Sequence, residues 1–194
     1  MTRVGILLFD QVEELDAVGP WEVFGMWAKL RPEEAEVVAF APRAGAVRAS
    51  KGLTLHADRS AADVGRLDVL VHPGGAGTRP QLKDPEHLAW VRDQRARVPL
   101  MTSVCTGSLV FAAAGLLAGR PATSHWGALD QLAELDPSID VRRDERFVDD
   151  GDVVTSSGVS AGIDMALHLV ARLAGVERAR EVRRHMQYDP APPV

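Results

Sequence analysis

Short apolar runs rich in β-branched residues alternate with longer helical stretches along nearly the whole chain. We expect strands over residues 4–9, 35–40, 67–71 and 98–104, and a β-hairpin over residues 47–56. We expect helices over residues 20–28, 85–97, 160–173 and 176–186. Strands that alternate with helices predict a parallel sheet covered by helices on both faces. The sequence therefore predicts an α/β fold.

Cys105 lies at the corner between the expected strand 98–104 and an Ala-rich helix that Gly115 ends. Such a corner holds its side chain at the carboxyl end of a parallel sheet, where ligands bind. The partial positive charge of the helix N-terminus should lower the pKa of the thiol and favour the thiolate. The sequence thus predicts a nucleophile. The alternative is a small buried apolar residue, which a free cysteine commonly is.

Four carboxyl groups follow the first expected strand. Asp10, Glu13 and Glu14 are expected in solvent. Asp16 lies between Leu15 and the apolar residues 17–20, so we expect its side chain to face inward. A buried carboxyl group needs a partner or a raised pKa, and a thiolate nearby would give it reason to stay protonated. Asp16 is therefore a candidate for moving a proton during catalysis.

A glycine-rich loop, residues 73–77, follows the third expected strand. The backbone N–H groups of Gly74 and Gly75 are unobstructed by side chains. The N–H groups of Gly75 and Thr106 are candidates for an oxyanion-type pocket opposite Cys105. The alternative for the loop is a tight turn. A dinucleotide site is only weakly indicated, because the loop follows the third strand and Pro80 interrupts the residues after it.

Two further side chains are candidates for the site. Thr106 directly follows Cys105, and its hydroxyl group either orients water or substrate or packs at the helix start. His125 lies near the expected edge of the sheet and is a candidate acid–base or substrate-binding group, although a single histidine is more often structural. No metal site is expected, because the remaining histidines share no metal-ligand spacing: His56, His72, His87, His168 and His185.

Composition excludes several function classes. The net charge is −5 and no basic run occurs, so a nucleic-acid surface is not expected. No apolar stretch approaches the roughly 18 residues that span a bilayer, and no signal peptide is recognised at the N-terminus. One cysteine forms no internal disulfide, which favours the reducing cytoplasm. The length suits one domain over residues 1–194.

Taken together, these segments resemble the ThiJ/PfpI superfamily, whose members have the class I glutamine-amidotransferase-like fold. The resemblance covers nearly the whole chain. Its main stretches are residues 15–20 (LDAVGP), 72–77 (HPGGAG), 102–110 (TSVCTGSLV), 122–126 (ATSHW) and 160–164 (SAGID). Leu-Asp paired with Ser-Val-Cys-Thr-Gly is more specific to the isonitrile hydratase branch.

The resemblance implies a flavodoxin-like parallel sheet sandwiched between helices, with a nucleophile elbow after a central strand. It also implies a homodimer without a cofactor, with Cys105 as nucleophile, Asp16 as its carboxylic partner and Thr106 in the pocket. The peptidases of the family and many of its other members carry histidine directly after the cysteine, so Thr106 argues against peptidase activity. The activity expected is that of a lyase that hydrates a small isonitrile to a formamide. The alternatives are a cysteine-based redox or ligand sensor and a glyoxalase- or amidase-like enzyme.

Overall fold

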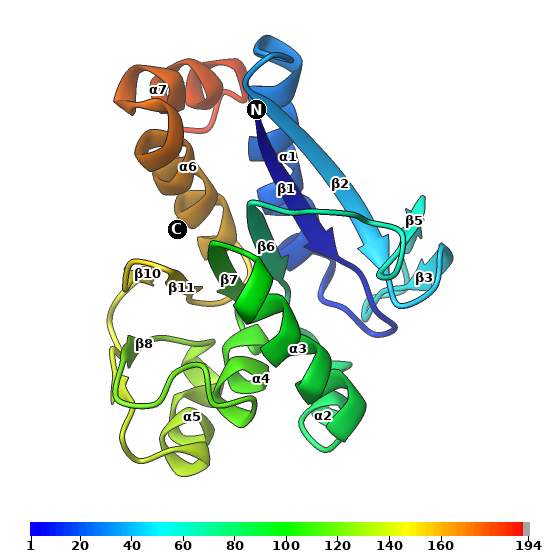
Figure 1. The fold of residues 1–194 in the computed structure, drawn as a ribbon. Helices are drawn as coiled ribbons and strands as arrows, with labels where there is room; N and C mark the ends of the chain where they lie inside the picture. The colour runs from blue at the N-terminus through cyan, green and yellow to red at the C-terminus, as the bar shows by residue number, and fades with distance from the viewer. Residues whose placement is uncertain (192–194) are drawn as a thin grey trace.

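A seven-stranded sheet forms the centre of the protein in the computed structural model, which describes residues 1–191 (Figure 1). Its strand order is β10–β11–β7–β6–β1–β2–β5, and all neighbours are parallel except β10 and β11. The strands are β1 (Thr2–Leu7), β2 (Ala35–Ala41), β5 (Arg59–Ser60), β6 (Val69–His72), β7 (Leu100–Val104), β10 (Phe147–Asp149) and β11 (Val153–Ser156). The α/β fold expected from the sequence is confirmed.

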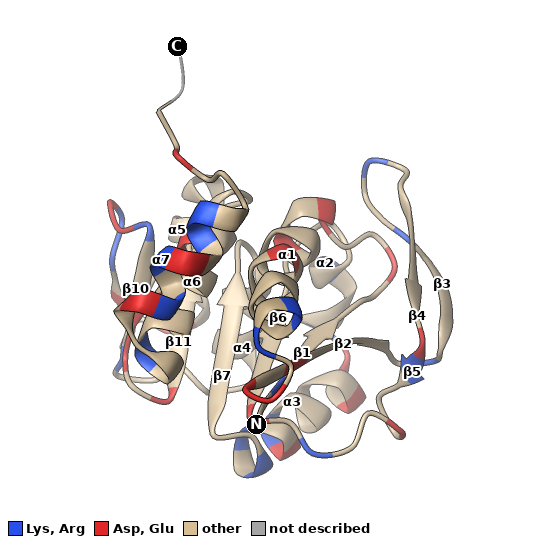
Figure 2. Cartoon of the chain, turned by 90° about the horizontal axis from the view of Figure 1, so that it is seen from above, with Lys and Arg blue, Asp and Glu red and all other residues tan. Residues whose placement is uncertain are grey.

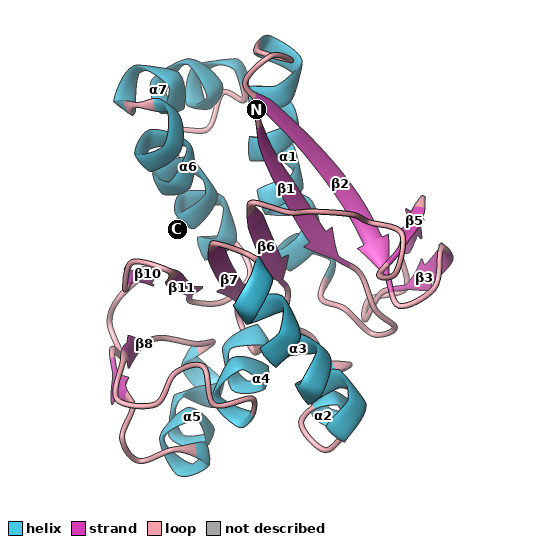
Figure 3. Ribbon diagram, in the orientation of Figure 1, coloured by secondary structure: helices cyan, strands magenta, loops and turns pink. Residues whose placement is uncertain are grey.

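Helices cover both faces of this sheet (Figure 3). One layer holds α1 (Glu14–Leu30), α6 (Ala161–Ala174) and α7 (Val176–His185), which contact one another. The other holds α2 (Thr78–Gln81), α3 (Pro85–Arg97), α4 (Gly107–Ala113), the 3₁₀ turn η1 (Trp126–Ala128) and α5 (Leu129–Leu135). Because both faces are covered, every residue of β6, β7 and β11 is buried. The three strands begin with apolar residues and carry buried polar ones toward their carboxyl ends: His72, Thr102, Ser103, Thr155 and Ser156.

Charged residues lie on the outer elements. Figure 2 shows β7 without charged residues, whereas α7 carries both signs. β6 has no Lys, Arg, Asp or Glu either. No helix within residues 1–191 has the length and apolar character needed to cross a membrane.

Two small sheets lie outside the main one. The expected hairpin is confirmed as β3 (Gly45–Arg48) paired antiparallel with β4 (Thr54–Ala57). Its turn is attached to the start of α1, because Ser50 Oγ donates to Glu13 and Glu14 and Lys51 forms an ion pair with Glu13. The second small sheet pairs β8 (Pro121–Ala122) with β9 (Asp140–Val141).

The first helix begins six residues earlier than expected. We expected its start at residue 20, whereas α1 begins at Glu14 and contains Pro20 in its interior. Pro20 has no N–H to donate to the carbonyl of Asp16, four residues before it. Burial of Asp16, Ala17 and Gly19 against the rest of the protein offsets this loss. Asp16 therefore lies in the first turn of a helix rather than in a loop.

Candidate active site

The corner at Cys105 joins the end of β7 to the start of α4, and its backbone is left-handed, with φ of 57°. A non-glycine residue in this region costs roughly 1–3 kcal/mol and needs support from its surroundings. The Cys105 N–H donates to the carbonyls of Ser156 and Ser157, at 3.1 and 3.2 Å. Its carbonyl accepts from the hydroxyl groups of Ser108 and Ser124, at 3.1 and 3.0 Å. These bonds hold the nucleophile elbow in place.

Asp16 is completely buried beside this corner. Its Oδ2 accepts from the Gly74 N–H at 2.9 Å. Burial raises the pKa of the Asp16 carboxyl group to about 7, and the charge of Glu13 acts in the same direction. Hydrogen bonds from the Gly74 N–H and the Cys105 thiol oppose this rise in pKa. No cation contacts the carboxylate among residues 1–191, and the charge of Lys51 acts on it only from a distance, so hydrogen bonds from backbone and thiol are its direct stabilisation.

The expected thiolate is contradicted. Cys105 is only 6% exposed, and burial raises the pKa of its thiol to about 12. The negative charge of Asp16 raises this pKa further, whereas the N–H groups of Thr106 and Val159 lower it. The helix-terminus argument left out burial and the neighbouring acid, and these two effects dominate. At neutral pH the thiol keeps its proton, and the Asp16 carboxyl group beside it, with its pKa raised to about 7, can both take and give a proton.

The glycine loop is built around Asp16 and Thr106. A Cβ on Gly74 would lie 2.5 Å from the Thr106 nitrogen and 2.8 Å from Asp16 Oδ2, so only glycine fits. The Gly75 N–H donates to Thr106 Oγ1 at 3.0 Å. The Gly75 N–H is therefore already used within the protein in this conformation, and its part in an oxyanion pocket stays a prediction. The Gly74 N–H is used in the same way on Asp16.

The hydroxyl group of Thr106 lies behind the nucleophile. Besides the Gly75 N–H, it contacts the hydroxyl of Thr78 at 3.1 Å. The Thr78 hydroxyl also lies 2.8 Å from the Gly75 carbonyl, so the two threonines and Gly75 form one network. Thr106 is 7% exposed. In this arrangement its hydroxyl positions the loop, and direct contact of that hydroxyl with substrate stays a prediction.

Val159 was missed by the sequence analysis. It lies just before α6, and its backbone N–H lowers the pKa of both Asp16 and Cys105 by hydrogen bonding to their charged forms. Its φ of 52° is left-handed, which a β-branched residue rarely adopts. Because the functional group is a backbone N–H, the side chain gives no signal of it.

His125 lies close to the same segment but outside this set of contacts. Its Nδ1 accepts from the Gly127 N–H at 3.1 Å, and its ring fills the space beside Gly158, where a Cβ would come within 2.4 Å. Within residues 1–191 no hydrogen bond joins His125 to Cys105 or Asp16. A role of His125 toward substrate stays a prediction.

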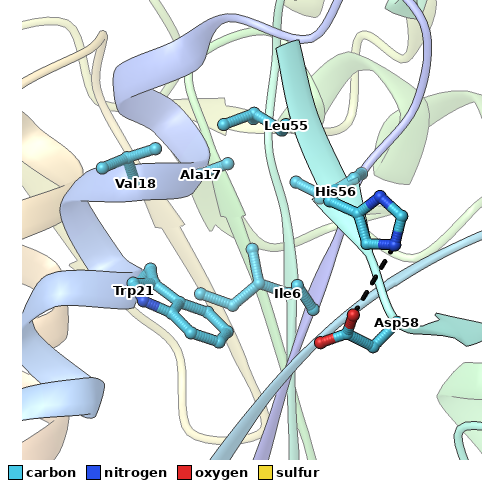
Figure 4. Close-up of a pocket in the computed structure, with 9 residues that line it drawn as sticks. Ile6, Ala17, Val18, Trp21, Leu55, His56 and Asp58 are labelled. Carbon is cyan, nitrogen blue, oxygen red and sulfur yellow. Dashed lines mark ion pairs between the residues drawn. The ribbon is translucent and has the colours of Figure 1, made fainter. Parts of the chain in front are cut away.

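An apolar pocket of about 320 Å³ lies on the other side of the first turn of α1 (Figure 4). Ala17, Val18 and Trp21 of α1 face Leu55 across it. His56 and Asp58 form an ion pair at 3.7 Å at its rim, and Cys105 does not line it. Within residues 1–191 no group of three or more His, Cys, Asp and Glu side chains is placed to hold a metal ion.

The fold and the strained cysteine corner define a class of α/β proteins, and comparison with known families gives the same class. The pattern of the DJ-1/PfpI family matches residues 2–172. The chain belongs to the DJ-1/PfpI family, as its sequence motifs predicted.

Three relatives describe the range of this family around the chain. The isonitrile hydratase of Pseudomonas putida is 42% identical over 98% of this chain and 80% of that protein. The crystal structure of a ThiJ/PfpI family protein from Pseudomonas syringae superimposes with a TM-score of 0.89, at 34% identity, over 100% of this chain and 77% of that one. The transcriptional regulator CdhR of Pseudomonas aeruginosa is 36% identical over 71% of this chain but only 40% of its own length.

Proposed function

We propose that this protein hydrates isonitriles, R–N≡C, to N-substituted formamides with Cys105 as the nucleophile. The observation that carries the proposal is the buried pair of Asp16 and Cys105, in which a carboxylate without a cation faces a thiol. The 42% identity to the Pseudomonas putida isonitrile hydratase supports the substrate class. The same pair suits this substrate because an isonitrile carries little net charge and enters an apolar site without losing strong hydration.

In the first half of the proposed reaction, the carbon of the isonitrile receives both a proton and the sulfur. The Asp16 carboxylate takes the proton of the Cys105 thiol, and the sulfur attacks the terminal carbon. Asp16 then delivers that proton to the same carbon. The product is a thioimidate, R–N=CH–S–Cys105, and Asp16 is again a carboxylate.

In the second half, water releases the product. Asp16 accepts a proton from water as the hydroxide adds to the thioimidate carbon, and the nitrogen receives that proton. Collapse of R–NH–CH(OH)–S–Cys105 breaks the carbon–sulfur bond. The hydroxyl proton returns to the sulfur through Asp16, which leaves R–NH–CHO and the free thiol. Sulfur supplies the nucleophile and the carboxyl group moves the protons, so the proposed reaction uses no metal or cofactor.

The backbone around the pair supports these charge changes. The N–H groups of Val159 and Thr106 stabilise negative charge on the sulfur while it attacks and when it leaves. Both donors are already in place, Val159 in a left-handed backbone and Thr106 next to the left-handed Cys105, so little reorganisation is needed during the reaction.

A ligand sensor is the second candidate. The similarity to the transcriptional regulator CdhR favours it. The matched region makes up 40% of that protein, so a region similar to this chain is one part of a regulator. In this case the site at Cys105 and Asp16 would bind a small molecule without turnover. A peroxide sensor is less favoured, because the raised pKa of the Cys105 thiol leaves little thiolate for oxidation.

The decisive experiment measures formamide formation from cyclohexyl isonitrile and para-nitrophenyl isonitrile by the purified protein. We expect turnover in the parent and none in Cys105→Ala or Cys105→Ser, with circular dichroism showing that both variants fold. Methylglyoxal and simple amides are assayed in parallel, because turnover of these alone would indicate a glyoxalase or amidase. Saturable binding of an isonitrile without any product would indicate a sensor and contradict the hydratase.

The remaining expectations concern the whole protein and stay predictions: a homodimer, a cytoplasmic location, and one domain over residues 1–194, of which 192–194 lie outside the described residues. Leu15, Val18 and Trp21 are partly exposed on α1 and are the surface to examine for self-association. Sedimentation at micromolar concentration measures the oligomer directly. A stable species near the monomer mass of 20.9 kDa would contradict the dimer.

A further inference from the structure

His72 is a completely buried histidine that the reaction above does not use. It is the last residue of β6, and the rings of Phe9 and Phe111 lie 5.6 and 5.8 Å from its own. Its Nδ1 lies 2.8 Å from the carbonyl oxygen of Pro73, and its Nε2 lies 3.1 Å from Nε2 of His87. Both ring nitrogens of a buried imidazole are thus bonded, and each bond has a definite direction.

The directions follow from the chemistry of the partners. A carbonyl oxygen only accepts, so His72 Nδ1 carries a proton and donates it to Pro73. Burial lowers the pKa of His72 to about 3, so the ring is neutral and its Nε2 accepts. The proton between the two rings therefore belongs to His87 Nε2, which donates to His72.

The carbonyl of Pro73 and the N–H of Gly74 belong to the same peptide group. A hydrogen bond to the oxygen of a peptide polarises it and makes its N–H a stronger donor. That N–H donates to Asp16 Oδ2 at 2.9 Å. Three hydrogen bonds therefore run in one direction, from His87 to His72, from His72 to the peptide, and from the peptide to Asp16.

We propose that His87 and His72 are positioning residues that stabilise the ionised form of Asp16 through this chain of hydrogen bonds. The inference rests on the proposed function, in which the Asp16 carboxylate is the base. Its contribution is to keep Asp16 a better acid than burial alone would allow, and to fix Oδ2 of the carboxylate toward the Gly74 N–H. Oδ1 of Asp16 is buried without a hydrogen-bond partner among the described residues.

Few other charged groups lie around these three hydrogen bonds. Asp16 also faces Glu13, which raises its pKa, and the thiol of Cys105 and the N–H of Val159, which lower it. The ammonium group of Lys51, which is paired with Glu13, also attracts the Asp16 charge without contacting it. Asp84 at the start of α3 raises the pKa of His87, but burial has the larger effect and lowers it. The groove beside His87 also holds three further charged residues of α3, Glu86, Asp93 and Arg97. If His87 does take up a proton at low pH, its Nε2–H still donates to His72, so the direction of the chain is kept.

The test is a ¹³C NMR titration of the Asp16 carboxyl group in protein labelled at aspartate, with the resonance assigned by its loss in Asp16→Asn. His72→Phe removes the bond to Pro73, and His87→Leu removes the first donor of the chain. His87→Gln is the conservative variant, because its amide can still donate to His72. His168→Leu is the matched control, since His168 bonds to Asp149 away from this site.

Loss of a donor raises the pKa of an acid, so we expect the Asp16 midpoint to rise by a few tenths of a pH unit in His87→Leu. This is the scale expected when polarisation changes a charged hydrogen bond by roughly 10–30%. The rise should be larger in His72→Phe and absent in His87→Gln and His168→Leu. The low-pH limb of the kcat/KM profile should move with the midpoint.

An unchanged midpoint in folded His87→Leu and His72→Phe would overturn the proposal. If His72→Phe does not fold, the pair His87→Leu and His87→Gln decides alone. The titration needs no isonitrile, so it separates the two proposals. A shifted midpoint in a protein without hydratase activity would contradict the proposed function only, whereas turnover with an unshifted midpoint would contradict the hydrogen-bond chain only.

Discussion

The carboxyl groups at the two ends of the central sheet have pKa values shifted in opposite directions. At the amino end of β11, Arg120 binds Asp152 at 2.6 Å and lowers its pKa, and Arg95 forms a second ion pair with it. At the carboxyl end, Asp16 is buried with backbone and thiol donors, and its pKa is raised to about 7. One carboxylate is stabilised by cations near water, whereas the other is held where its charge is unfavourable.

The difference teaches where this fold places reactivity. A carboxylate paired with arginine has no reason to take a proton at neutral pH, so Asp152 contributes only to stability. A carboxylate without a cation takes a proton readily, which a base next to a thiol must do. The cost is a loss of stability at the site, as is common where activity depends on a buried polar group.

The largest expected effect is on turnover. Asp16→Asn should keep the fold, because the amide retains an oxygen for the Gly74 N–H, but it cannot take the thiol proton. Activity should fall by roughly 10²- to 10⁴-fold, the scale for losing a general acid–base group. Steady-state rates of formamide formation measure this loss. Asp130→Asn removes an exposed carboxylate paired with Arg143 and is the matched control. Near-parental activity of Asp16→Asn would leave Asp16 only a structural role.

The second effect is on stability and depends on pH. The folded pKa of Asp16 is raised from 3.8 to about 7, so folding and proton binding favour each other. That stability is complete below pH 3.8 and is lost as the pH rises through about 7, by at most about 4 kcal/mol. Asp16→Asn lacks this loss. We therefore expect the unfolding free energy of Asp16→Asn, measured in urea, to rise relative to that of the parent between pH 4 and pH 8. An advantage that is the same at both pH values would contradict the raised pKa.

The third effect tests how the Thr106 hydroxyl group holds the glycine loop in place. Thr106→Val keeps the β-branched shape but leaves the Gly75 N–H without its acceptor. A buried donor without a partner costs roughly 1–3 kcal/mol, and a displaced loop should also weaken transition-state stabilisation by a similar amount. Both the unfolding free energy and kcat/KM should fall. Thr106→Ser retains the hydroxyl group and is the control. If Thr106→Val equals Thr106→Ser in rate, the hydroxyl does not serve catalysis.

The smallest effect belongs to the amino end of the sheet. Asp152→Asn removes the charge that pairs with Arg120 and Arg95 near the surface. Exposed ion pairs contribute roughly 0–1 kcal/mol, so the unfolding free energy at pH 7 should fall by less than about 1 kcal/mol. The difference should shrink further in 1 M salt, while hydratase activity stays at the parental level. A loss of activity here would remove the contrast between the two ends.

Sequence reasoning succeeded where side-chain identity decides the outcome. The alternation of strands and helices was enough for the α/β sheet, and the corner between β7 and α4 was enough to single out Cys105. The inward-facing Asp16 was expected because its neighbours are apolar, and the structure buries it completely. Both residues come from opposite halves of the chain, and the parallel sheet brings their elements to one edge.

It failed where the environment or the backbone decides. The protonation of Cys105 depends on how deeply the sulfur is buried and on the charge of Asp16, which no local pattern contains. Val159 acts through its backbone N–H, so its side chain gives no sign of this role in the sequence. His72 was set aside for lacking metal-ligand spacing, although its bonds reach Asp16 through a peptide group. Pro20 was read as a helix start, whereas tertiary packing keeps it inside α1.

The single buried thiol also makes this protein a reporter of its own fluctuations. Cys105 is the only cysteine in the sequence, and it is 6% exposed. A bulky thiol reagent reaches it only when the surrounding structure opens. With dilute reagent the labelling rate reports the free energy of opening, and with concentrated reagent it approaches the rate of opening itself. Cys105 is thus a natural labelling site that reports local unfolding at the place where the reaction is expected to occur.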